Sequence, residues 1–213
     1  MTENQRNHIW HPEAIKQDVE RTLRHLHDRS LVGDFYLAGG TGLALQSGHR
    51  RSVDLDFFSE EMFNEELLVQ KLGGLHDFSV ASKAGSTLHT GIGAVKVSFL
   101  GYPYPVLFPL LFFLGVRLAD ARDIACMKIS AIASRGTRRD FIDLYVVSKE
   151  YGLAAILDLF KGKYSRANYS GIHILKSLTY FEEAERDPMP DMLVDLSWKD
   201  VKAFFTTEVP ALL

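Results

Sequence analysis

Two aspartates, Asp54 and Asp56, stand in the alternating segment VDLDFF that begins at Val53. Side chains alternate along a β-strand, so a strand here would place both carboxylates on one face and Val53 with its apolar neighbours on the other. Two adjacent carboxylates repel each other and are costly to bury, and a divalent cation with oxygen ligands removes that cost. The pair is therefore predicted to hold Mg²⁺ or Mn²⁺.

A glycine-rich turn precedes the aspartate pair. The apolar run at residues 35–38 predicts a buried strand, and it ends in Gly39, Gly40 and Thr41. Thr41 is expected to cap a short helix over residues 42–46. The start of that helix would offer backbone N–H groups and the positive end of a dipole, and glycines allow a close approach of a ligand. These three residues are therefore predicted to cradle the phosphates of a nucleotide.

One short segment thus combines a phosphate cradle with two ligands for a hard metal. This combination suits phosphoryl or nucleotidyl transfer, which depends on positioning and charge neutralisation more than on covalent chemistry. The alternative interpretation is a strand with a solvated acidic face, because exposed acidic residues are ordinary. An aspartate pair alone would favour that alternative, whereas the glycine turn directly before it favours a functional site.

The run LAGGTGLALQSGHRRSVDLDFF, residues 37–58, resembles the nucleotidyltransferase signature of the DNA polymerase β superfamily. It is most similar to the AbiEii/AbiGii toxin branch, whose members are the toxins of bacterial toxin–antitoxin and phage-defence pairs. The resemblance implies transfer of a nucleoside monophosphate from an NTP to a hydroxyl of tRNA or protein, with release of pyrophosphate. It also implies a cognate antitoxin protein as a partner.

The superfamily usually has a third carboxylate on a later strand, and here the best-aligned position carries Ser98. A hydroxyl is a weaker Mg²⁺ ligand than a carboxylate and a poor base. This difference leaves two alternatives to the toxin hypothesis. One is a nucleotide-binding regulatory module that has lost catalysis, and the other is a transferase that modifies a small molecule such as an aminoglycoside.

A second group of charged residues lies in the segment MKISAIASRGTRRDFIDLY. Lys128 and Arg135 are one heptad apart, so a helix would place them on one face. The segment resembles a second motif of the AbiEii family, and this implies that Lys128, Arg139, Asp140 and Asp143 lie near the nucleotide. Lys128 is predicted to neutralise charge that develops in the reaction. The alternative for Arg139 and Asp143 is a simple salt bridge between helix positions i and i+4.

The rest of the sequence predicts an α+β protein in two parts. The prolines of residues 101–105 cannot continue the interior of a sheet, so this stretch is expected to be the boundary. Residues 1–105 are expected to form a polymerase β-like nucleotidyltransferase core, a small mixed sheet with flanking helices. Residues 106–213 are expected to form a mainly helical subdomain that closes the cleft, with residues 170–185 as one of its helices.

The composition is that of an ordinary soluble globular protein, with 46% hydrophobic and 24% charged residues among 213. A net charge of −3 means that any surface for nucleic acid would have to be local. The single cysteine excludes an internal disulfide and suits a reducing cytosol. The most apolar run, residues 106–116, is shorter than the roughly 20 residues that span a bilayer. A cytoplasmic protein without a membrane partner is therefore expected.

Overall fold

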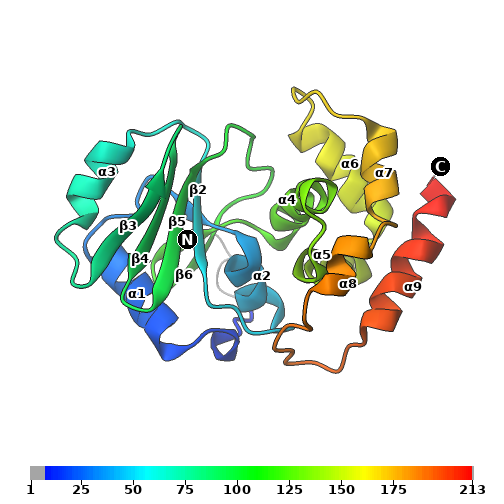
Figure 1. The fold of residues 1–213 in the computed structure, drawn as a ribbon, viewed down its shortest axis with the longest axis horizontal. Coiled ribbons are helices and arrows are strands. Elements are labelled where there is room, and N and C mark those ends of the chain that lie inside the picture. The colour runs from blue at the N-terminus through cyan, green and yellow to red at the C-terminus, as the bar shows by residue number, and fades with distance from the viewer. Residues whose placement is uncertain (1–7, 213) are drawn as a thin grey trace. The chain divides into compact units, whose positions relative to one another are not determined.

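The computed structural model describes residues 8–212, and the chain divides after Asp120 into two compact units (Figure 1). The predicted domains covered residues 1–105 and 106–213, and of these residues 1–7 and 213 lie outside the described part. The division comes later than the boundary predicted at residue 105. Two strands that follow that point, β6 (Leu111–Phe113) and β7 (Val116–Leu118), still belong to the sheet of the first unit, because β7 pairs in parallel with β1 (Tyr36–Leu37).

The first unit contains a mixed seven-stranded sheet with the strand order β3-β4-β5-β2-β1-β7-β6. Its central pair, β2 and β5, runs parallel, and β5 pairs antiparallel with β4. The remaining sheet bounds are β2 (Leu55–Ser59), β3 (Phe78–Lys83), β4 (Thr87–Ile92) and β5 (Val95–Gly101). The mixed sheet and the helices that flank it agree with the predicted α+β class.

One face of the sheet packs against α1 (Gln17–Asp28) and α3 (Glu65–Leu72). The inward positions of both helices recur at helical spacing, which is the pattern of a helix with one buried face. Phe57 and Phe99 lie at the centre of this core with stacked rings whose centroids are 5.5 Å apart. The core on this face therefore fixes strands β2 and β5 and leaves their opposite face for polar side chains.

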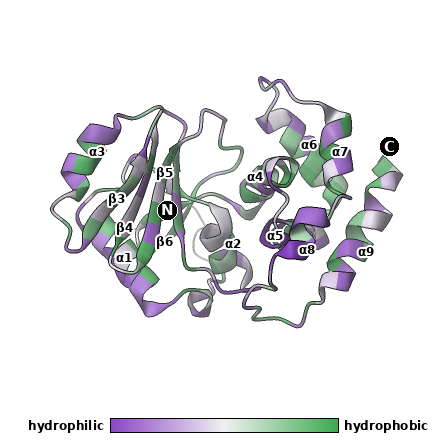
Figure 2. Cartoon of the chain, viewed as in Figure 1, coloured by the Kyte–Doolittle hydropathy of each residue, from purple (hydrophilic) through white to green (hydrophobic). Residues whose placement is uncertain are grey.

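The second unit is helical and comprises α4 (Ala121–Ser134), α5 (Arg138–Tyr151), α6 (Leu153–Lys163), α7 (Gly171–Ser177), α8 (Glu182–Arg186), α9 (Trp198–Glu208) and a final 3₁₀ turn (Pro210–Leu212). Figure 2 shows α8 as largely hydrophilic, and its single buried residue is Ala184. Within residues 8–212, no helix is long and apolar enough to cross a bilayer.

The single helix predicted over residues 170–185 is wrong, because the structure has α7 and α8 there with a turn between them. The Thr179 hydroxyl donates a hydrogen bond to the carbonyl of Lys176 at 3.1 Å and so competes with continuation of the helix. Beyond the turn, the ring of Phe181 packs on Phe141 with centroids 5.1 Å apart. Tertiary packing of these aromatic rings therefore decides where the second helix starts.

A buried ion pair joins α4 to α6 in the helical unit. Lys163 Nζ donates to Asp123 Oδ1 at 2.7 Å, and each side chain is 1% exposed. Cys126 also lies on α4, and its burial, together with the nearby Asp123 charge, raises the pKa of the thiol to about 12. The thiol is therefore protonated at neutral pH and packs as a small apolar group.

Candidate functional site

Asp56 lies inside β2, as the alternating pattern predicted, whereas Asp54 lies directly before the first residue of that strand. Leu55 and Phe57 are fully buried in the core, while Asp54 and Asp56 are only half-buried. Val53 differs from the prediction, since it lies outside β2 and is 44% exposed. The reason is that the chain before Asp54 does not pair in the sheet beyond a single bridge between Ser52 and Ile15.

The glycine turn and the second aspartate are in direct contact. Gly39 adopts a φ of +62°, and a Cβ atom at this position would lie 2.7 Å from Asp56 Oδ2. The backbone N–H of Ala38 also donates to the carbonyl of Asp56 at 3.0 Å. Helix α2 (Gly39–Ser47) begins at this glycine, so the Asp56 carboxylate lies beside the N-terminal end of a helix.

The predicted capping role of Thr41 is wrong. The helix starts earlier than expected, its N-cap is Ala38, and Thr41 lies inside the first turn with 1% of its surface exposed. The Thr41 hydroxyl hydrogen-bonds the carbonyl of Asp54 and, at 2.8 Å, the hydroxyl of Ser52. Its side chain therefore holds the Asp54 segment against α2. The backbone N–H of Thr41, which has no acceptor within an α-helix, is the group that could meet a phosphate.

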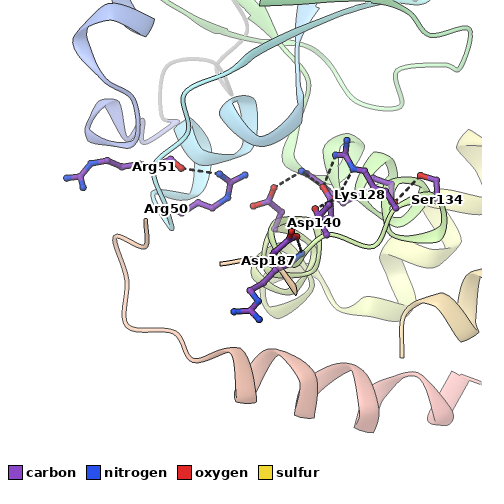
Figure 3. A network of polar contacts seen from close by, with 11 residues as sticks. Arg50, Arg51, Lys128, Ser134, Asp140 and Asp187 are labelled. Carbon is purple, nitrogen blue, oxygen red and sulfur yellow. Dashed lines mark hydrogen bonds and ion pairs between the residues drawn. The ribbon is translucent and has the colours of Figure 1, made fainter. Parts of the chain in front are cut away.

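Arg50 is a residue of this region to which the sequence interpretation gave no role. Its side chain is 3% exposed, and a Cβ atom on Gly40 would clash with its guanidinium. Arg50 Nη1 donates to the carbonyl of Arg51 at 3.1 Å (Figure 3). A buried cation therefore covers the second residue of α2. The available signal was the basic turn of residues 49–51, which connects α2 to the aspartates.

Replacing Gly39 with alanine tests the contact between the turn and the carboxylate. The positive φ is strained for alanine, and the new methyl group would push the Asp56 carboxylate out of position. We expect Gly39→Ala to reduce the nucleotidyl transfer that the sequence predicts by about 100-fold, as a misplacement near 1 Å can do. Gly93→Ala is the matched control for strain. Gly93 also has a positive φ, of +57°, but a Cβ there would meet nothing within 4 Å.

The rates of both glycine variants would be measured alongside their unfolding free energies in urea. The control variant is expected to lose a similar small amount of stability and to keep the wild-type rate. Equal rates in the two glycine variants would contradict the proposed role of the Gly39 contact.

Three strands align polar side chains on the face opposite the core. Asp56 of β2 is directly paired with Ser98 of β5, and Ser98 is directly paired with His89 of β4. His89 Nδ1 lies 3.1 Å from Ser98 Oγ, which is a hydrogen-bonding distance. Ser98 therefore lies beside Asp56, as the sequence comparison with the superfamily placed it, and His89 follows it on the next strand.

In the helical unit, Lys128 lies between two buried carboxylates (Figure 3). Its Nζ atom is 2.9 Å from Asp140 Oδ1 and 2.7 Å from Asp143 Oδ2, and both aspartates are at most 1% exposed. Asp140 also accepts a hydrogen bond from Arg135 Nε at 2.9 Å and one from the Thr137 hydroxyl at 2.6 Å. Arg135 lies one residue beyond the end of α4, outside the helix predicted to carry it, but it contacts the same carboxylate as Lys128.

The structure brings together three of the four predicted residues of this second group. Lys128, Asp140 and Asp143 form one buried cluster, whereas Arg139 is exposed on α5. The carboxylate of Asp143 binds Lys128 across two helices, in place of the alternative pairing with Arg139 along a single helix. The cluster therefore links α4 to α5 through buried ion pairs.

The environment of Asp140 predicts a pH dependence of the helical unit. Burial opposes ionisation of this carboxyl, but the Lys128 charge, the Arg135 contacts and the Thr137 hydrogen bond together lower its pKa below the ordinary value. A lowered folded-state pKa contributes stability above the unfolded pKa of about 3.9, and this stability is lost as the pH falls further. We expect the urea-unfolding free energy of the helical unit to decrease below about pH 4.

Asp140→Asn should flatten this dependence below about pH 4, because the variant has no carboxyl to titrate at this position. Glu185→Gln is the control. Contacts with Lys202 and Trp198 lower the pKa of Glu185, but its carboxylate is exposed to solvent. This control should therefore change the slope much less. Parallel pH profiles for the wild type and Asp140→Asn would contradict the assignment.

The aspartate pair fits a metal ion that arrives with its substrate. Within residues 8–212, no group of three or more His, Cys, Asp or Glu side chains could hold a metal ion. Mg²⁺ is commonly bound by one or two carboxylates, with substrate phosphates and water as its other ligands. Asp54 and Asp56 match that donor set, whereas they are too few for a site made of protein ligands alone.

Comparison with known proteins gives matches over most of the chain. A family model described as "Nucleotidyl transferase AbiEii toxin, Type IV TA system" matches residues 21–211. The uncharacterized protein aq_aa25 of Aquifex aeolicus is 35% identical over 201 residues, which cover 92% of this chain and 96% of that protein.

Solved structures show the same fold at low sequence identity. MenT4, a nucleotidyltransferase toxin of Mycobacterium tuberculosis, superposes with a TM-score of 0.54 at 15% identity, over 92% of this chain and 86% of its own. JHP933 from Helicobacter pylori superposes with a TM-score of 0.52 at 18% identity, over 96% and 93%. The predicted nucleotidyltransferase fold is confirmed.

Proposed function

Because the chain belongs to the AbiEii family of nucleotidyltransferase toxins, we propose that it moves a nucleoside monophosphate from an NTP to an acceptor hydroxyl and releases pyrophosphate. The family makes the chain an NTP-using transferase. The observation that supports the location of the site is the contact between the Gly39 backbone and the Asp56 carboxylate. That contact joins a helix N-terminus, which suits phosphate, to a carboxylate that suits a metal ion.

The start of α2 supplies the binding groups for the triphosphate in this proposal. The first N–H groups of a helix have no intrahelical acceptor and carry partial positive charge, so those of Gly39, Gly40 and Thr41 suit phosphate oxygens. Arg50 adds a full positive charge next to Gly40, and a guanidinium binds phosphate oxygens strongly. These residues would orient the leaving pyrophosphate.

Asp54 and Asp56 would hold Mg²⁺ or Mn²⁺ in this proposal. When bound, such a cation neutralises phosphate charge and polarises the phosphoryl oxygens. The chain's own contribution is to keep the two carboxylates in place. The Thr41 hydroxyl fixes the backbone at Asp54, and the antiparallel pairing of β1 with β2 fixes the strand that carries Asp56.

Lys128 is proposed to neutralise charge during the transfer, with Arg139, Asp140 and Asp143 near the nucleotide, as the family resemblance implies. Within the helical unit the Lys128 ammonium is almost fully buried between Asp140 and Asp143. A role in catalysis therefore requires the ammonium to exchange one carboxylate for a phosphate oxygen. Buried charges are costly to separate, so such an exchange is expected only when nucleotide is bound.

For the acceptor we propose tRNA, and for the partner a cognate antitoxin that counteracts this activity. The family description as a toxin–antitoxin system supports the antitoxin. The acceptor test is incubation of the full chain with each α-labelled NTP, Mg²⁺ and total RNA, and separately with total cell protein. Label on tRNA that disappears in an Asp54→Ala variant supports the proposal, whereas label on protein alone would identify a protein acceptor.

Ser98 favours one alternative function. Its hydroxyl occupies the position beside Asp56 where a third carboxylate would complete a fuller acidic site. A chain that has lost catalysis would bind NTP as a regulatory module. Tight NTP binding without transfer to RNA or to protein would support that alternative over the transferase.

A further inference from the structure

The row formed by Asp56, Ser98 and His89 suggests a function for a histidine outside both predicted groups of site residues. Directly paired residues on neighbouring strands place their side chains next to each other on the same face. The opposite face of these three strands is the apolar core, in which Phe57, Phe99 and Leu88 are fully buried. The row is therefore held on a rigid support and directed away from the core.

The chemistry of the row follows from the contact between the imidazole and the hydroxyl. His89 Nδ1 lies 3.1 Å from Ser98 Oγ, while the His89 side chain as a whole is exposed. If Nδ1–H donates to the hydroxyl, the proton of the neutral ring is on Nδ1 and Nε2 keeps a lone pair that can accept a proton. The contact with Ser98 thus sets the direction of the ring, and in that tautomer Nε2 is the proton acceptor.

The spacing of the row leaves space for a substrate. Neighbouring strands lie about 4.8 Å apart, so His89 and Asp56, two strand spacings from each other, have backbones roughly 10 Å apart. Side chains that project from the same face at that separation can contact a reacting group between them. A phosphate near Asp56 would lie over Ser98. The acceptor hydroxyl would approach Nε2 on the side of the ring distal to the sheet, because Nδ1 is the nitrogen that faces Ser98.

We propose that His89 is the general base of the transfer reaction and that Ser98 is its positioning residue. Together the two residues replace the third carboxylate that the sequence lacks. The acceptor oxygen forms a bond to the α-phosphorus of the NTP, and the bond from that phosphorus to pyrophosphate breaks. Pyrophosphate leaves with the electron pair, and the proton of the acceptor hydroxyl moves to His89 Nε2. This assignment rests on the proposed function.

The test compares single-turnover transfer by the full chain, with α-labelled NTP and total tRNA as the probes and total cell protein as a second acceptor pool. A general base typically contributes 10²–10⁴-fold to a rate. We expect His89→Ala and His89→Gln each to slow transfer by about 100-fold or more, while the Kd for NTP changes less than about threefold. His76→Ala is the matched control, since His76 lies in the same unit and its side chain is 93% exposed.

For Ser98 the measurement is the transfer rate at unchanged NTP affinity, which a purely structural role would not lower selectively. Ser98→Ala should lower the rate about tenfold with the NTP affinity retained, because the ring loses its orienting hydrogen bond. Ser98→Asp introduces a carboxylate beside Asp56. The double variant with His89→Ala and Ser98→Asp should transfer at least about tenfold faster than His89→Ala alone, since a carboxylate can itself accept the proton.

The outcomes separate this assignment from the proposed function. A wild-type chain that transfers label while His89→Ala and His89→Gln match its rate within about threefold overturns the His89 assignment alone. A wild-type chain that transfers label to neither RNA nor protein overturns the proposed function, and the His89 assignment with it. Thermal melting of each variant shows that a lost rate does not come from a lost fold.

Discussion

Asp56→Asn is expected to reduce nucleotidyl transfer on the order of a thousandfold while the protein stays folded. The amide keeps the size of the side chain but removes the negative charge that would hold a cation against the triphosphate, and loss of one electrostatic contact of this kind costs about 10²–10³ in rate. Asp56 is half-buried and lies next to Gly39 and near Asp54.

The matched control for this prediction is Asp28→Asn. Asp28 is an exposed aspartate of the same unit, at the last position of α1, and its replacement should leave the rate unchanged. Transfer would be measured with saturating Mg²⁺ and NTP, and folding by thermal melting. A rate for Asp56→Asn within tenfold of the wild type would refute the assignment of this carboxylate to the reaction.

Lys128→Met should destabilise the helical unit by about 3–5 kcal/mol, because it removes the partner of two buried carboxylates. Asp143 is fully buried and would lose its contact at 2.7 Å, while Asp140 would keep Arg135 and Thr137. Methionine nearly matches the length of lysine, so the effect reports the lost charge more than a cavity. Unfolding in urea, followed by circular dichroism of this helix-rich unit, measures the loss.

The control for Lys128 is Lys161→Met on α6 of the same unit. Lys161 pairs with Asp158 at 2.8 Å, but both side chains are well exposed, so its loss should cost at most about 1 kcal/mol. Equal losses in the two variants would show that the Lys128 cluster is not electrostatically coupled. Comparison of transfer rates at a temperature where Lys128→Met is still folded would then separate its structural contribution from a catalytic one.

Local sequence patterns predicted the features that are set by residues adjacent in the sequence. The alternation around Leu55 predicted β2 and the direction of Asp56, because the side-chain period of a strand is a local property. The glycine pair predicted the start of a helix, which the structure has at Gly39, before the predicted range of residues 42–46. Asn64 caps α3 in the same local way, since its side chain accepts from the N–H of Leu67 three residues later, at 3.0 Å.

Other features depended on contacts between distant parts of the chain. No local signal shows that the Thr41 side chain would bind the backbone of Asp54 instead of capping a helix, and the basic turn of residues 49–51 does not show that Arg50 would cover Gly40. The boundary after Asp120 follows from the pairing of β7 with β1. The proline-rich stretch between β5 and β6 led to a boundary predicted too early, because local sequence does not show that a later strand returns to the sheet. The split of the predicted helix at residues 170–185 follows from aromatic packing on Phe141.

For the candidate site, the sequence by itself determined which segment carries the phosphate cradle and the aspartate pair, and which family the chain resembles. Only the tertiary structure decided the neighbours of Asp56. Strand register is set by the packing of the whole core, and a slip of one residue would turn Ser98 and His89 to the other face. The observed register places Ser98 beside Asp56 and His89 beside Ser98, because Leu55, Phe57, Val97 and Phe99 must all face the core.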